Sequence, residues 1–165
     1  MNKITKSLPL PIVGLMLALA ALGNLVLSYG NIYRNIFGCI SAIILLFVLL
    51  KIVKYPKDIK NDLNNPVVAS VFPTLLMGIM LLSTYLPSKS LGYIVWLIGL
   101  GLHIGLIIWF SAKYLLAFNI KKVFPSWYIV YVGIVVASVT APAFNKASIG
   151  QVCFWFGFVS YLVLL

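Results

Sequence analysis

The chain has 165 residues, of which 63% are hydrophobic and 8% charged, and its mean hydropathy is +1.13. This composition excludes a soluble globular domain. The net charge of +10 could indicate nucleic-acid binding, but the basic residues are spread over the junctions between apolar runs and form no single patch. We therefore expect the lipid bilayer as a partner and no nucleic acid.

Six apolar segments follow one another along the chain. Most approach the roughly 20 residues that a helix needs to cross a bilayer. The first is too long for the apolar region of a signal peptide and lacks a small-residue cleavage pattern, so we predict that it is retained. The predicted fold is an all-α integral membrane protein. The segments are Leu8–Ser28, Phe37–Val53, Val67–Leu86, Gly92–Ala112, Ser126–Pro142 and Ile149–Leu165.

The basic residues are distributed unevenly between the two sets of segment ends. Nine lie at the N-terminus or in the links after the second and fourth segments, and three lie at the other junctions. Because cytoplasmic loops carry the excess of Lys and Arg, this bias predicts a multi-pass cell-membrane protein with a cytoplasmic N-terminus. The larger set is Lys3, Lys6, Lys51, Lys54, Lys57, Lys60, Lys113, Lys121 and Lys122, and the smaller is Arg34, Lys89 and Lys146.

Short and long connections alternate between the segments. Short turns at Tyr29–Ile36, Pro87–Leu91 and Ala143–Ser148 join segments into pairs, and longer links at Lys54–Pro66 and Lys113–Pro125 join one pair to the next. The repeating unit is therefore a helical hairpin. We predict one transmembrane domain over residues 1–165, built of hairpins at approximately 8–53, 67–112 and 126–165.

Six of the eight prolines fall in or beside the odd-numbered segments, and no proline lies inside an even-numbered one. A proline inside a helix removes an amide donor, and the membrane tolerates this where neighbouring helices or a water-filled cavity satisfy the freed carbonyls. The pattern favours an inner ring of odd helices, with even helices facing lipid. In the fourth segment, Gly99, Gly101 and Gly105 permit close helix packing. The six prolines of the odd-numbered segments are Pro9, Pro11, Pro66, Pro73, Pro125 and Pro142, and Pro56 and Pro87 lie in connections.

The acidic residues narrow the range of transport functions. Asp58 and Asp62 are the only acids, and both lie in the link between the second and third segments. Their spacing favours a solvated charged turn over a catalytic pair. No apolar segment contains a carboxylate, whereas proton pumps and cation carriers usually keep one within the membrane. Cation transport is therefore disfavoured.

Other reactive side chains give no enzyme signature. His103, the single histidine, has no further ligands at helical spacing, so a buried hydrogen-bonding residue is favoured over a functional one. Cys39 and Cys153 lie in different segments without a metal-binding pattern and are interpreted as small apolar residues. We predict no catalytic residues, metal site or cofactor.

Two stretches carry a family resemblance. Leu8–Gly23 (LPLPIVGLMLALAALG) and Phe124–Ser138 (FPSWYIVYVGIVVAS) resemble the tellurite-resistance/dicarboxylate transporter family. That family includes bacterial tellurite-resistance channels, malic acid permeases and plant slow anion channels. The resemblance implies ten helices arranged as five hairpins around a central pore, with odd helices inside, and a homotrimer.

The resemblance also sets expectations for particular positions. Six of ten helices are covered, so we expect the sequence to stop at Leu165 within helix six, before the ninth helix that carries the family's pore-occluding phenylalanine. Val130 or Tyr131 stands where some relatives have proline, which predicts a weaker bend there. Phe72, beside Pro73, is either a pore-facing aromatic or a core-packing residue.

The resemblance implies an anion channel or a transporter of C4-dicarboxylates (malate-like) or tellurite-related anions. Small anions are then the expected cargo, selected by a constriction, a positive potential and the absence of negative side chains. The alternative is a non-conducting membrane scaffold or partner-binding half-protein. The candidate pore-lining residues, all on odd helices, are Gly14, Phe72, Pro73, Gly78, Gly133 and Ser138.

Overall fold

The computed structural model describes residues 2–115 and 124–165, which contain helices and no strand. Six helical stretches are long and apolar enough to cross a membrane, so the predicted all-α, multi-pass membrane architecture is confirmed. Each span corresponds to one predicted segment, although the boundaries move by several residues. The spans are Ile12–Tyr29, Asn31–Lys54, Pro66–Ser83, Lys89–Leu115, Trp127–Phe144 and Ala147–Leu164.

The first hairpin pairs α2 with α3. The chain reverses at Gly30, whose φ of 141° lies in a region that residues with a side chain rarely adopt. Within the hairpin, the Ser41 hydroxyl donates a 2.7 Å hydrogen bond to the Met16 carbonyl, so both helices share a buried polar contact. The elements are α1 (Asn2–Ser7), α2 (Ile12–Leu25), the 3₁₀ turn η1 (Val26–Tyr29) and α3 (Asn31–Lys54).

The second hairpin follows a short helical link. The Asn65 side chain caps the third span by accepting a hydrogen bond from the Val67 amide at 3.0 Å. Pro73 then divides that span in two, and the Thr74 hydroxyl donates to the Val71 carbonyl at 2.8 Å beside the break. The elements are α4 (Pro56–Asp62), α5 (Pro66–Val71), α6 (Thr74–Ser83), α7 (Lys89–Phe110) and the π turn η2 (Ser111–Leu115).

The third hairpin contains an irregular fifth span. A 3₁₀ turn at Val132–Ile134 interrupts the helix directly after Val130 and Tyr131, so this span bends although neither position is proline. Whether the bend is weaker than in relatives with proline stays a prediction. Gly133 lies in this turn, where the absence of a side chain permits close approach to Met77. The elements are α8 (Trp127–Tyr131), η4 (Val132–Ile134), α9 (Val135–Thr140), η5 (Ala141–Phe144) and α10 (Ala147–Leu164).

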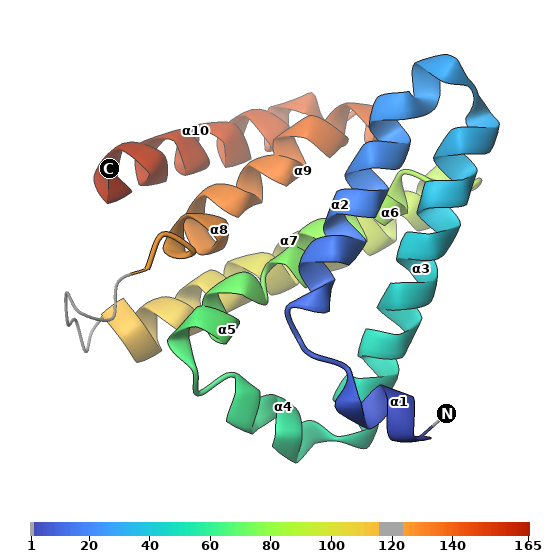
Figure 1. Cartoon of the computed structure of the whole chain (residues 1–165). Helices are drawn as coiled ribbons and strands as arrows, with labels where there is room; N and C mark the ends of the chain where they lie inside the picture. The colour runs from blue at the N-terminus through green and yellow to red at the C-terminus, as the bar shows by residue number, and fades with distance from the viewer. Residues whose placement is uncertain (1, 116–123) are drawn as a thin grey trace.

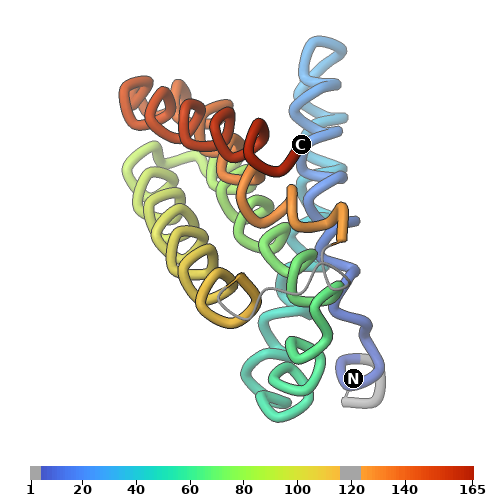
Figure 2. The backbone as a smooth tube through the Cα atoms, turned by 90° about the vertical axis from the view of Figure 1, so that its left-hand side faces the viewer, coloured from blue at the N-terminus to red at the C-terminus, as the bar shows by residue number. Residues whose placement is uncertain are grey.

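The odd spans form a central row. α6 packs against both α2 and α9, whereas α3, α7 and α10 pack mainly on their own hairpin partners; Figures 1 and 2 show these helices from two sides. As a result, 67% of the third span is buried, against 22% of the first and 33% of the fifth. We call α2, α6, α8 and α9 the central row.

The two ends of the bundle differ in connectivity and charge. The three tight turns, at residues 30, 84–88 and 145–146, lie at one end, which we call the turn end; α1 and α4 lie at the other, the link end. Arg34, Lys89 and Lys146 belong to the turn end. Lys121 and Lys122 lie outside the described residues.

The glycines of α7 do not share one role. A Cβ at Gly99 would lie 2.9 Å from Met80 Cγ, so this glycine permits close packing of α7 on α6, as predicted. Gly101 and Gly105 would meet nothing within 4 Å and line a groove of about 360 Å³. For these two, the expectation of close packing within the chain is wrong, because they lie on the opposite face of the helix.

Candidate anion pathway

Two grooves follow each other along the central row. The first, of about 490 Å³, lies at the turn end and is bordered by all three odd spans. The second, of about 370 Å³, lies between α6 and the fifth span. Val139, which is 74% exposed, lines both, so the two grooves adjoin at this side chain. The first is lined by Ala21, Asn24, Leu25, Leu27, Arg34, Leu81, Thr84, Val139, Thr140 and Ala143.

Arg34 is the one charged side chain that lines the first groove. Its Nε donates to Asn24 Oδ1 at 3.0 Å, and its Nη2 donates to the Thr84 carbonyl at 2.7 Å and to Thr84 Oγ1 at 3.4 Å. The guanidinium carbon lies 4.2 Å from the centroid of the Tyr85 ring, within the range of a cation–π contact. These contacts fix the guanidinium between the first and second hairpins.

Tyr85 is seated in a socket made by two glycines. Its hydroxyl donates a 2.6 Å hydrogen bond to the Ala20 carbonyl. A Cβ at Gly38 would collide with the Tyr85 ring, and one at Gly23 would collide with its hydroxyl. The second hairpin therefore packs on the first through Tyr85, whose ring fits only because Gly23 and Gly38 have no side chains. In this position the ring stacks against the Arg34 guanidinium.

The second groove is apolar and lies at the bend of the fifth span. Gly133 lines it, and a Cβ there would lie 2.8 Å from Met77 Sδ. His103 packs behind the bend: it is fully buried, and its Nε2 donates to the Val130 carbonyl at 3.1 Å. The interpretation of His103 as a buried hydrogen-bonding residue is confirmed, and its Nδ1 has no partner among the described residues.

The other predicted pore residues occupy different surroundings. Gly14 lies on an open face of α2, with nothing within 4 Å of a Cβ. At Gly78 a Cβ would collide with the Met16 methyl group, so this glycine serves the contact between α2 and α6. Ser138 lies against α10, because a Cβ at Gly150 would lie 3.2 Å from its Cα. A pore-lining role for these residues stays a prediction.

Phe72 and Pro73 lie at the break between α5 and α6. Pro73 is fully buried. Phe72 packs against a cluster that contains Val13 and Val48, and it also borders the groove beside α7. This side faces α3 and α7, away from the two grooves of the central row. The surroundings of Phe72 favour the core-packing alternative over a pore-facing aromatic.

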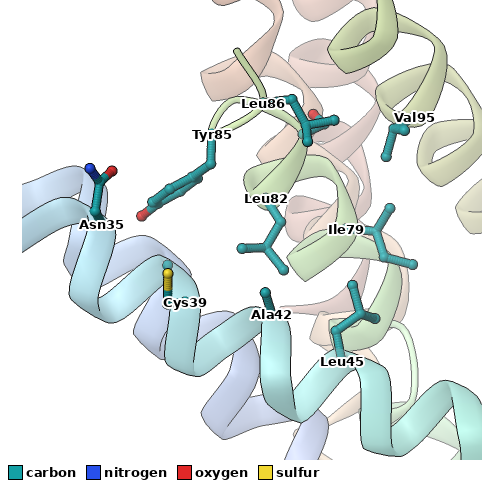
Figure 3. A pocket seen from close by; sticks show the side chains of 11 residues that line it. Asn35, Cys39, Ala42, Leu45, Ile79, Leu82, Tyr85, Leu86 and Val95 are labelled. Carbon is teal, nitrogen blue, oxygen red and sulfur yellow. The ribbon is translucent and has the colours of Figure 1, made fainter. Parts of the chain in front are cut away.

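A third groove, of about 550 Å³, lies between α3 and α6 (Figure 3). Cys39, Ala42 and Leu45 of α3 face Ile79 and Leu82 of α6, with an α7 side chain beyond them. Its walls come partly from even helices, whose remaining exposed side chains are mostly large and apolar. We therefore place this groove on the lipid side of the bundle, outside the candidate pathway.

At the link end, a buried lysine lies close to an acid. Lys51 is only 5% exposed; its Nζ donates to the Leu8 carbonyl at 2.6 Å and lies 3.5 Å from a carboxylate oxygen of Asp62. The buried lysine therefore has an acidic partner. A separate contact, a 2.6 Å hydrogen bond between the hydroxyls of Ser70 and Ser126, joins the second and third hairpins.

The comparison with known families agrees with this architecture. Residues 36–165 match the family SLAC1, described as voltage-dependent anion channel. The chain belongs to this family. The predicted relationship to slow anion channels is thereby confirmed, and the family consists of channels and transporters. No curated protein matches the chain.

The sequence did not single out the polar residues of the first groove. Arg34 was assigned only to the charge bias, and Asn24 and Thr84 were unremarked. One signal was available: Arg34 is the only arginine among twelve basic residues. Arginine and lysine are not interchangeable where a fixed, planar donor is needed, so this exception marked a position worth examining.

Proposed function

We propose that this protein is an anion-selective channel of the cell membrane, and that anions travel along the two grooves of the central row. The observation that carries the proposal is the family match together with the position of the acids: Asp58 and Asp62, the only two in the sequence, lie in α4 and outside every span. A cation within these six spans would meet no compensating charge, and burying an unpaired ion is costly.

Basic residues at both ends support the same selectivity. The net charge of +10 raises the local concentration of anions near the membrane surface. Screening acts over about 8 Å at physiological ionic strength, so this attraction weakens as salt rises. Selectivity then requires a constriction and a positive potential, without any chemical step.

Finer features of the proposal follow from the resemblance and the charge bias. The link end faces the cytoplasm, and residues 1–165 form one transmembrane domain of three hairpins that belong to a ring of five. Three copies assemble into a homotrimer. Malate-like dicarboxylates and tellurite-related anions are candidate cargo alongside chloride.

The test measures the reversal potential of purified full-length protein in liposomes under a potassium chloride gradient. We expect a value near the chloride equilibrium potential; a value near that of potassium would defeat the proposal. Replacing chloride by malate or tellurite on one side gives the relative permeabilities. Folded protein that passes no ion would favour the non-conducting scaffold.

A further inference from the structure

Arg34 differs from the buried cation at the other end because it has no ion pair among the described residues. Asp58 and Asp62 both lie in α4, beyond the far end of α3. No described carboxylate therefore compensates the guanidinium beside a groove that is lined mostly by apolar side chains. A charge in such surroundings attracts a counter-ion more strongly than one in water.

The hydrogen bonds of Arg34 leave one amino group available. A guanidinium has five N–H donors. Nε and Nη2 are engaged by Asn24 and Thr84, whereas Nη1 has no acceptor among the described residues. Contacts with Tyr85 and with both polar partners hold the group still, so an anion would bind a preformed donor at a low entropic cost.

The two threonine hydroxyls that line the groove already donate hydrogen bonds to backbone carbonyls. Thr84 Oγ1 donates to the Leu81 carbonyl at 2.7 Å, and Thr140 Oγ1 donates to the Val136 carbonyl at 2.7 Å. Neither hydroxyl proton is free for a ligand, so the donors left at the groove are Nη1 of Arg34 and the amide nitrogen of Asn24, whose Oδ1 accepts from Arg34. One cationic amino group with a neutral amide beside it suits a single small anion, whereas a dicarboxylate needs paired donors for each end.

We propose that Arg34 forms a binding site for a small monovalent anion, such as chloride or nitrate, at the turn-end mouth of the pathway. The site rests on the proposed channel function for its role, which is to collect anions at the entrance. Its existence as a binding site is independent of conduction. Arginine suits it because a guanidinium is planar and weakly hydrated, so little hydration is lost on binding.

The first experiment measures binding without transport. Thermal unfolding of the purified full-length protein is followed at constant ionic strength while gluconate is replaced by nitrate or chloride. We expect the small anions to raise the unfolding temperature of the wild-type protein, because they bind only the folded state. In Arg34→Gln this anion-dependent increase should vanish. Lys89→Gln, which removes an exposed charge from the same end, should retain it.

A second variant keeps Arg34 in place. Ala143 is exposed and lines the groove, so Ala143→Asp supplies a carboxylate that competes with the anion for Arg34. Ala147→Asp adds the same charge at an exposed site of the turn end outside the groove lining. Loss of anion-dependent stabilisation in Ala143→Asp but not in Ala147→Asp supports the site even if Arg34→Gln does not fold.

Conductance gives the corresponding functional measurement. We expect the chloride concentration at half-maximal conductance to rise about tenfold in Arg34→Gln, the size of one charged hydrogen bond. Equal anion-dependent stabilisation in the wild-type protein, Arg34→Gln and Ala143→Asp would overturn the site, even if the channel remains anion-selective. Retained binding in a protein that does not conduct would instead contradict only the proposed function.

Discussion

At the link end, Lys51 is 5% exposed and lies 3.5 Å from Asp62, whereas at the turn end Arg34 stacks on Tyr85 and has no ion pair among the described residues. Both cations are tied to backbone carbonyls of another segment, Leu8 in one case and Thr84 in the other. The difference is that only Lys51 has an acidic partner. A paired lysine contributes mainly to structure, because its field is cancelled nearby, whereas the unpaired arginine projects a positive potential into the groove beside it.

This contrast also separates two uses of a basic residue in a membrane protein. The link end holds both acids and most of the lysines, so its charges serve packing and orientation. The turn end has few charges, and one of them is held in place by the fold itself. We therefore infer that the net charge raises the anion concentration near the membrane, whereas the position of Arg34 decides where in the groove an anion binds.

The largest expected effect concerns which end is outside. In a background of Cys39→Ala and Cys153→Ala, a cysteine placed at Lys89 should react completely with a membrane-impermeant maleimide in intact cells. A cysteine at Lys57 should react only after permeabilisation, because the excess of lysines at the link end retains it in the cytoplasm. Labelling at Lys57 from outside would reverse the proposed orientation and assign the paired lysine to the outer surface.

A second prediction concerns the effect of adding an acid to the grooves. Val139 lies where the two grooves meet and is 74% exposed, so Val139→Asp should fold. We expect chloride flux per protein in liposomes to fall by about tenfold, because the carboxylate repels anions and pairs with Arg34. Val139→Asn has the same shape without the charge and is the matched control. Equal flux in both variants would exclude this groove from the pathway.

The smallest effect is expected where the link-end pair is broken. Asp62→Asn leaves Lys51 buried without a counter-charge, but the Asp62 side chain is 41% exposed. The cost should therefore be about 1–2 kcal/mol of unfolding free energy, below that of a fully buried pair. Unfolding in lipid bicelles measures this difference. Asp58→Asn removes an acid that has no ion pair among the described residues, and an equal loss of stability there would contradict the comparison.

Sequence reasoning was most successful for local properties. The six spans, the three hairpins and the difference in charge between the ends follow from length, hydropathy and the placement of lysine, each of which can be counted along the chain. Close helix packing at Gly99 also follows from the sequence, although its partner Met80 does not. A helix that crosses a bilayer needs a minimum apolar length whatever it packs against, and this makes its existence a property of its own residues.

The faces of those helices were not predictable in the same way. In a soluble protein, polar residues mark the outer face of a helix, but here apolar side chains cover both the packed face and the lipid face. Gly101 and Gly105 therefore resembled Gly99 in the sequence although they line an open groove. For the same reason, the direction in which Phe72 points had to be read from its neighbours on α2 and α3.

The amino-acid sequence by itself determined that this protein is a helical membrane protein of an anion-channel family, with its acids kept outside the spans. The tertiary structure alone decided which side chains surround Arg34. Its partner Thr84 is 50 residues away, and Tyr85 reaches a carbonyl 65 residues away. Such contacts depend on how two hairpins dock, which is set by glycine-lined sockets and helix bends that carry no periodic signal along the chain.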